Sequence, residues 1–232
     1  MNLGSLFFTI FRRALNFGRI YLLVGMFLPV LFAVQISVAG GTAGSSVLDQ
    51  IYPLIIPVFV VLGSLGALMI FSSDKEKGVY EYLIAYGVDA STIFWSIIVA
   101  TMGIVSLVLV VSLAVTIGTL VVTWSALTVR FGELVLFYTI PLSFAATMFM
   151  SMAGMIWSQL TTRVAGVNSP AGIAPLLGIA PVLAVFFAAT RVGSGDLLYL
   201  VGGVSIAMIW AVVAMAYFAS SKMQRERFLS NA

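Results

Sequence analysis

Residues Ile93–Thr123 read IFWSIIVATMGIVSLVLVVSLAVTIGTLVVT, a run without a single charged side chain. A helix needs about 20 apolar residues to cross a bilayer, so this run is more than long enough. Polar residues do not alternate with apolar ones at a period of two, as they would in a strand of a membrane β-barrel. The run therefore predicts a membrane-spanning helix, and its extra length indicates that the helix tilts or protrudes.

Five further segments also lack Asp, Glu, Lys and Arg: Ile20–Gly40, Ile51–Phe71, Leu134–Leu160, Ala171–Thr190 and Leu197–Ala219. A charged residue at the centre of a span costs about 2.5–3.5 kcal/mol, whereas each Leu or Ile returns only about 0.3–0.6 kcal/mol. Such clean separation of charge from apolar runs is typical of membrane spans. We expect an all-α integral membrane protein in which residues 1–232 form a single transmembrane domain with six transmembrane helices.

The composition supports this class and excludes others. Of the 232 residues, 62% are hydrophobic and 8% are charged, and the mean hydropathy is +1.16. Soluble domains carry about 25% charged residues. The chain has no Cys and no His, which excludes thiolate nucleophiles, histidine bases and Cys/His metal centres. The pI is about 9.3. Because the basic residues flank the spans, we expect them to bind the headgroups of the lipid bilayer, and we expect the chain to bind no nucleic acid.

The distribution of basic residues predicts the orientation. With the N-terminus inside, the outer side holds only Arg130 and Arg191. The inner side holds nine basic residues: Arg12, Arg13, Arg19, Lys75, Lys77, Arg163, Lys222, Arg225 and Arg227. Cytoplasmic loops of membrane proteins carry such an excess of Lys and Arg. We therefore expect a multi-pass protein of the cell membrane with both termini in the cytoplasm.

Residues 1–19 form a separate unit in which polar and apolar residues recur at helical spacing. Thr9, Arg13 and Asn16 lie on one side, and Leu6, Ile10 and Ala14 lie on the other. This pattern predicts an N-terminal amphipathic helix in the cytoplasmic interface. A secretory signal is the alternative, but a signal carries its positive charge before its apolar stretch, and here the arginines follow it.

The stretch Ser72–Thr92, SSDKEKGVYEYLIAYGVDAST, is the only long polar connector. Ser73 and Glu76 have the spacing of a capping box, and Gly87 suits a helix end, which together predict a cytoplasmic helix over residues 73–86. Asp74 would suit the positive end of its dipole. The helix could rest its apolar face on the membrane or dock a soluble partner. Its three tyrosines, Tyr80, Tyr82 and Tyr86, are typical of contact surfaces but also suit a lipid headgroup region.

The sequence Asp74–Leu83, DKEKGVYEYL, followed by Val88 and a new apolar span, resembles the ABC transporter type-2 permease family. In that family an E-x-G-x-x-E-x-L stretch links spans two and three. The six-span layout, the amphipathic N-terminal helix, the basic tail and the glycine-containing end of span four, Gly154–Ser158, are similar as well. Two features depart from the family pattern: Tyr86–Asp89 replaces a Leu-Pro-Val-Ser type turn, and only Arg191–Asp196 separates the last two spans.

The resemblance implies a permease subunit of an exporter that works by alternating access. It implies partners: cytoplasmic ABC ATPase subunits, which would bind ATP and Mg, and a second permease copy in a homo- or heterodimer. It also implies that residues 73–86 act as a coupling helix. The positions carried over for coupling to the ATPase are Glu76, Gly78, Tyr80, Glu81 and Leu83.

The chain lacks chemistry of its own. A phosphate-binding P-loop needs Gly-x-x-x-x-Gly-Lys-Ser/Thr, and none of the three lysines, Lys75, Lys77 and Lys222, lies in that frame. No paired intramembrane carboxylates or other catalytic set is present. We therefore expect no enzymatic activity and no cofactor in this chain, and ATP hydrolysis in a partner subunit.

Four polar residues inside the spans are candidates for lining a substrate path: Gln35, Ser143, Thr147 and Ser151. An interhelical hydrogen bond is the alternative for Gln35, and close helix packing is the alternative for the three hydroxyls. The uncharged interior favours an apolar or lipid-like substrate. Two other functions stay open, namely a substrate-binding membrane module of a larger importer and a membrane assembly protein that transports nothing.

Overall fold

The computed structural model describes residues 3–39, 52–122, 129–160, 179–180, 182–184, 187 and 197–222. Within these ranges the elements are helical. They are α1 (Leu3–Phe17), α2 (Arg19–Ala39), α4 (Tyr52–Glu76), α5 (Val79–Ala85), α6 (Ala90–Val122), α7 (Val129–Leu134), the π-helical turn η1 (Val135–Thr139), α8 (Ile140–Leu160) and α10 (Leu197–Lys222).

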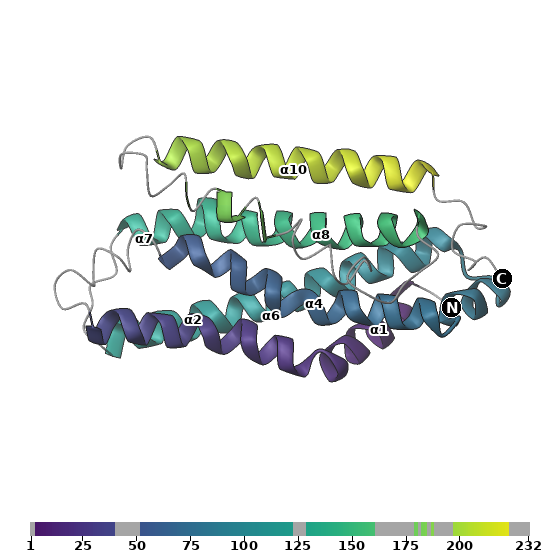
Figure 1. The fold of residues 1–232 in the computed structure, drawn as a ribbon, viewed down its shortest axis with the longest axis horizontal. Coiled ribbons are helices and arrows are strands. Elements are labelled where there is room, and N and C mark those ends of the chain that lie inside the picture. The colour runs from purple at the N-terminus through teal and green to yellow at the C-terminus, as the bar shows by residue number, and fades with distance from the viewer. Residues whose placement is uncertain are drawn as a thin grey trace.

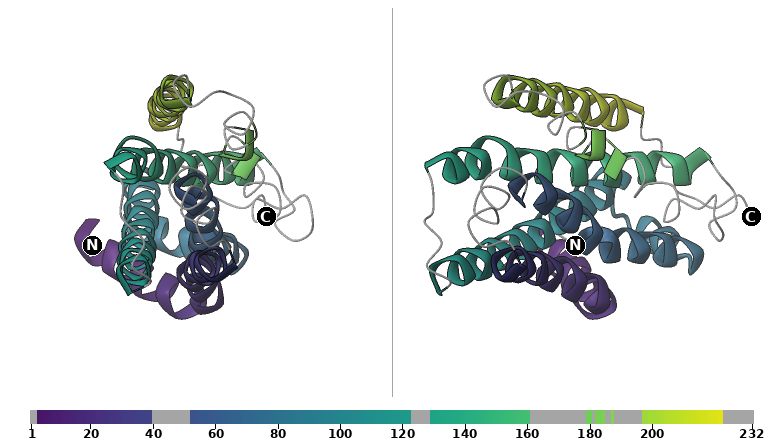
Figure 2. Two further views of the ribbon diagram at one scale, coloured as in Figure 1. Left: turned by 90° about the vertical axis from the view of Figure 1, so that its left-hand side faces the viewer. Right: turned by 60° about the vertical axis from the view of Figure 1, so that its left-hand side comes forward.

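The long helices form an elongated bundle (Figure 1). Helices α4, α6 and α8 pack against one another, α2 packs on α4 and α6, and α1 covers part of α6 and α4. Helix α10 lies on the outside of the bundle against α8 (Figure 2). Because α5 directly precedes the long helix α6 and α7 follows it, α5 and α7 lie at opposite ends of the bundle.

In the part of the chain that the structure describes, two stretches are long and apolar enough to cross a membrane, Ala90–Gly118 in α6 and Phe131–Met155 in α7 to α8. Helices α1 and α2 meet at a bend of 70° and give a third candidate if they form one span. The 33 residues of α6 extend over about 50 Å at 1.5 Å per residue, more than the bilayer core of about 30 Å. Length and composition therefore indicate a membrane protein, and the described residues are helical.

The predicted apolar segments largely coincide with helices. Of these segments, residues 20–39 lie in α2, 52–71 in α4, 93–122 in α6, 134–160 in α7, η1 and α8, and 197–219 in α10. The segment 171–190 falls mostly outside the described residues. A helix forms at the N-terminus as predicted, α1, whereas its place in the cytoplasmic interface stays a prediction. Its apolar residues Leu6, Ile10 and Ala14 are buried in the bundle, so this face packs on protein.

Two prolines inside helices are compensated by hydroxyl groups of neighbouring helices. Proline has no N–H, so it leaves the carbonyl four residues earlier without its helical partner. Pro29 of α2 leaves the Gly25 carbonyl, which accepts a hydrogen bond from Ser112 Oγ of α6 at 3.1 Å. Pro57 of α4 leaves the Pro53 carbonyl, which accepts a bond from Thr139 Oγ1 at 2.9 Å. Membrane helices tolerate proline where neighbours satisfy the freed carbonyls in this way.

Helix α4 closely approaches α2, and the junction between α1 and α2, through glycines. A Cβ atom added at Gly66 would lie 2.6 Å from the Gly18 Cα, and one added at Gly25 would lie 2.7 Å from the Gly63 Cα. Neither distance leaves room for a side chain. Small residues allow such close backbone packing, which is a common way to associate helices in membranes.

Candidate functional site

The polar connector between α4 and α6 starts differently from the prediction. Helix α4 continues through Ser73 and Glu76, so the predicted capping box is wrong: these residues form the end of one helix and not the start of the next. The break occurs at Gly78, whose φ of +67° is left-handed and favours glycine. Helix α5 then begins at Val79, and the helix predicted over residues 73–86 shortens to Val79–Ala85.

The end of α5 was predicted correctly. Gly87 has a φ of +81°. Its N–H donates to the Ile84 carbonyl at 3.0 Å, and the Val88 N–H donates to the Leu83 carbonyl at 3.0 Å. These two bonds form a Schellman motif, which satisfies the last carbonyls of a helix. Helix α6 begins at Ala90, so the short connection leaves α5 little freedom relative to α6.

One face of α5 is buried in protein. Tyr80 and Ile84 are each 3% exposed and pack in a cluster with residues of α1, α6 and α8, among them Leu6, Phe94 and Met152. Of the three tyrosines considered for a contact surface, Tyr80 is therefore the one that anchors α5 to the bundle, and its role in coupling stays a prediction. Burial also raises the pKa of Tyr80 well above its usual value. Leu83, half-buried, packs against the same cluster.

The opposite face of α5 is open. Tyr82 and Tyr86 are 65% and 72% exposed, respectively. Their hydroxyls lie 3.1 Å apart in a hydrogen bond, and their ring centroids are 4.8 Å apart. The bond to Tyr86 raises the pKa of Tyr82. Glu81 lies in the first turn of α5, where a carboxylate suits the helix dipole. The side chain of Glu76 lies outside the described residues.

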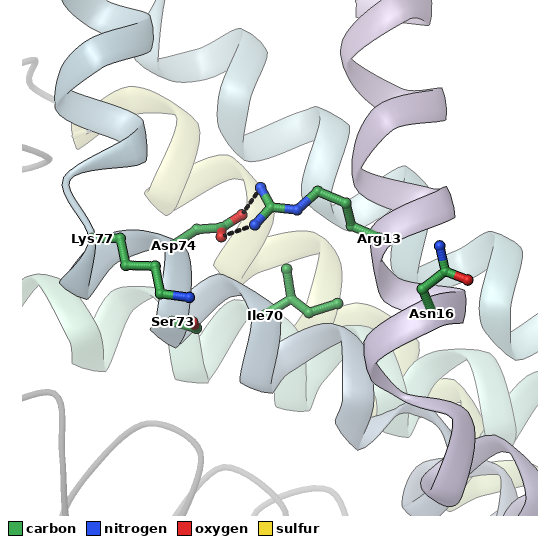
Figure 3. A pocket seen from close by; sticks show the side chains of 6 residues that line it. All are labelled: Arg13, Asn16, Ile70, Ser73, Asp74 and Lys77. Atoms are coloured by element: carbon green, nitrogen blue, oxygen red, sulfur yellow. Dashed lines mark hydrogen bonds and ion pairs between the residues drawn. The ribbon is translucent and has the colours of Figure 1, made fainter.

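An ion pair ties α1 to the last turn of α4, just before α5 (Figure 3). Arg13 donates from both terminal nitrogens to Asp74, at 2.7 and 2.9 Å. The Asp74 side chain is 4% exposed and that of Arg13 is 46% exposed. Burial raises the pKa of Asp74, while the charges of Arg13 and Lys77 oppose this shift. Asp74 was predicted at the start of a helix; it lies instead at the negative end of α4, where Arg13 offsets the unfavourable dipole.

The ion pair borders a cavity of about 270 Å³, which Asn16, Ile70, Ser73 and Lys77 also line. Figure 3 shows Arg13 reaching from α1 to the carboxylate, with Lys77 on the far side of Asp74. This polar contact was not predicted, because its two residues are 61 positions apart in the sequence. It links the amphipathic helix, α4 and the connector into one unit.

The candidate substrate-lining residues divide into two groups. Gln35 is exposed on the surface of α2, whereas Ser143, Thr147 and Ser151 are buried in α8, so the structure does not bring Gln35 to them. Ser143 Oγ donates to the Thr139 carbonyl at 2.6 Å. The hydroxyls of Thr147 and Ser151 are buried without a hydrogen-bond partner. Of the four candidate residues, Thr147 and Ser151 are therefore the two whose hydroxyls could bind a polar group within the bundle.

The described residues contain no group of three or more acidic, histidine or cysteine side chains that could hold a metal ion. Comparison with known proteins gives no match among protein-family models, curated proteins or solved structures. Function must therefore be argued from the connector, the ion pair and the membrane helices themselves.

Proposed function

We propose that this chain is the permease subunit of an ABC-type transporter in the cell membrane. It has six spans with both termini in the cytoplasm, pairs with a second permease and moves an apolar substrate outward by alternating access. The ATP and Mg are bound by separate ATPase subunits that dock on α5. The observation that supports this proposal is the two-sided structure of α5, with one face anchored in the bundle and the other open.

Such a helix can transmit force. Tyr80 and Ile84 connect α5 to α1, α6 and α8 in one closely packed cluster. Packed protein interiors resist compression and shift between discrete arrangements, so a push on α5 moves the helices attached to it. The Arg13–Asp74 pair adds α1 and α4 to the moving unit. ATP drives transport in this scheme only if the docked ATPase favours one arrangement of these helices over the other.

The open face of α5 provides the docking contact. Tyrosine is enriched at protein interfaces because a large apolar ring carries a polar end. The bond between the Tyr82 and Tyr86 hydroxyls holds the two rings together as a preformed surface.

The test compares a double substitution, Tyr82→Ala with Tyr86→Ala, with the control Tyr217→Ala, which removes a tyrosine that is 76% exposed on α10. Each variant is purified from native membranes in mild detergent, and ATPase activity is measured in the recovered complex. We expect a P-loop ATPase to co-purify with the wild type and with the control, and to be lost from the double variant. Glu76→Lys and Glu81→Lys should likewise uncouple ATP hydrolysis from transport while membrane insertion stays intact.

Two results would contradict the proposal. If the wild-type chain is recovered alone or with membrane proteins only, it is a substrate-binding module or an assembly protein. If the double variant keeps its ATPase and its transport, α5 is not the coupling element.

A further inference from the structure

A second cavity lies at the other end of the bundle, between η1 and α10, and the proposed function does not use it. Its volume is about 280 Å³, close to the lower limit of about 300–1,000 Å³ for small-molecule sites. Its apolar walls are formed by Leu134, Phe137, Pro141, Ile206 and Ile209. A cavity of this size and character accommodates an alkyl chain.

Two hydroxyl groups in the cavity wall have no hydrogen-bond partner. Tyr138 is fully buried and Ser205 is 3% exposed, and both residues line the cavity. Their hydroxyl oxygens form no hydrogen bond. A buried polar group without a partner is unfavourable, and such groups in a native structure call for an explanation. A ligand that brings a hydrogen-bonding group into this cavity would explain why two such hydroxyls occur in its lining.

The third polar residue of the cavity is charged. Glu133 lines it and is exposed, whereas Tyr138 and Ser205 are buried. The lining therefore combines one exposed carboxylate, two buried hydroxyl groups and apolar side chains. An amphiphile combines the matching groups: a cationic head, a polar linkage and an alkyl chain.

The backbone around this cavity is unusual in two respects. Residues 135–139 form a π-helical turn next to Pro141, and π turns are frequent at functional sites. On the opposite wall, α10 has Gly202, where an added Cβ would meet no atom within 4 Å. The missing side chain leaves this part of the cavity open.

We propose that the cavity between η1 and α10 binds a single-chain amphiphile with a cationic head. The chain packs on the apolar wall, an ester or amide linkage bonds to Tyr138 and Ser205, and the ammonium group pairs with Glu133. The ligand comes either from the bilayer, as a lipid with an amine head, or from solution as a free amphiphile. The site is independent of the coupling function of α5.

The experiment measures binding to the full chain in nanodiscs of uncharged lipid by titration calorimetry. The probe is N-dodecanoyl-ethylenediamine, which has a twelve-carbon acyl chain, an amide and an ammonium head. The matched control is N-dodecanoylglycine, which replaces the ammonium by a carboxylate. We expect saturable binding of the amine, tighter than the acid by about two- to fivefold, as befits an exposed ion pair. Glu133→Gln should abolish this preference.

Adjacent glycines of α10 provide a second pair of variants. Gly202→Leu places a side chain in the cavity, whereas Gly203→Leu adds the same side chain at an exposed position that also has no neighbour within 4 Å. We expect saturable amine binding to be lost in the first and kept in the second. Both glycine substitutions place their Cβ in open space, so neither displaces a neighbouring atom. Glu133→Gln changes an exposed side chain and tests the site without filling the cavity.

Lipid extraction distinguishes the two sources of ligand. A bilayer ligand would co-purify with the wild type and with Gly203→Leu, be absent from Gly202→Leu, and block the probe until it is removed. A free amphiphile would leave no such lipid, and the probe would bind directly. The proposal is overturned if the wild type shows no saturable binding, if Gly202→Leu binds as the wild type does, or if amine and acid bind equally.

Discussion

The hydrogen bond from Ser112 to the Gly25 carbonyl gives the sharpest test of the packing. This carbonyl has lost its helical partner because position 29 is proline, and the hydroxyl, 3.1 Å away, replaces it. Ser112→Ala should destabilise the chain by about 1 kcal/mol, the usual net value of a hydrogen bond. This lies between the average of about 0.6 and the maximum of about 1.7 kcal/mol measured between membrane helices. The change leaves a buried carbonyl without a donor.

The same substitution should cost almost nothing after Pro29→Ala, because the new alanine supplies the missing N–H to Gly25. The coupling energy of the double-mutant cycle is then close to the full cost of Ser112→Ala in the wild type. The measurement is equilibrium unfolding of the four proteins in mixed micelles. Thr101→Val is the matched control: its buried hydroxyl donates within α6, to the Ile97 carbonyl at 2.9 Å, so the cost is smaller and independent of Pro29. An equal cost of Ser112→Ala in both backgrounds would refute the explanation.

Arg13→Met should cost up to about 3 kcal/mol at neutral pH, since it leaves Asp74 buried without its partner while Arg13 itself is 46% exposed. Burial raises the pKa of Asp74 in the folded state above its ordinary value of 3.8, so the folded chain binds this proton more tightly than the unfolded chain does. The free-energy cost of Arg13→Met therefore shrinks as the pH falls through the raised pKa. Unfolding curves from neutral to mildly acidic pH should show this recovery of stability in Arg13→Met, and they should show none in the double variant Arg13→Met with Asp74→Asn. Gly66→Ala should destabilise the chain by about 1–3 kcal/mol, because its Cβ would lie 2.6 Å from the Gly18 Cα. Gly118→Ala is the control and should not destabilise it, because a Cβ there meets no atom within 4 Å. The midpoint of thermal unfolding compares the two variants.

The sequence was sufficient for features that depend on local composition. Uncharged apolar runs predicted α2, α4, α6, α8 and α10, because excluding charge from a span is a strong energetic requirement. Gly87 predicted the end of α5, because only glycine adopts a left-handed C-terminal position without strain.

Other features depended on contacts that no local pattern contains. Ser73 and Glu76 fit a helix start, yet α4 extends through them until Gly78 breaks it. The four-residue spacing of Tyr80 and Ile84 indicates one apolar face, but only the contacts with α1 and α6 show that this face packs on protein. The Arg13–Asp74 pair and the hydroxyl that compensates Pro29 connect residues far apart in sequence, so they became visible only in the fold.

The docking role of α5 is tested most directly by photo-crosslinking in native membranes. A photoreactive phenylalanine analogue is placed separately at positions 80, 82, 84 and 86, two of them buried and two exposed. The docking account predicts crosslinks to an ATP-hydrolysing subunit from positions 82 and 86 and none from 80 and 84. Crosslinks to membrane proteins alone, or to the ATPase from all four positions equally, would contradict it.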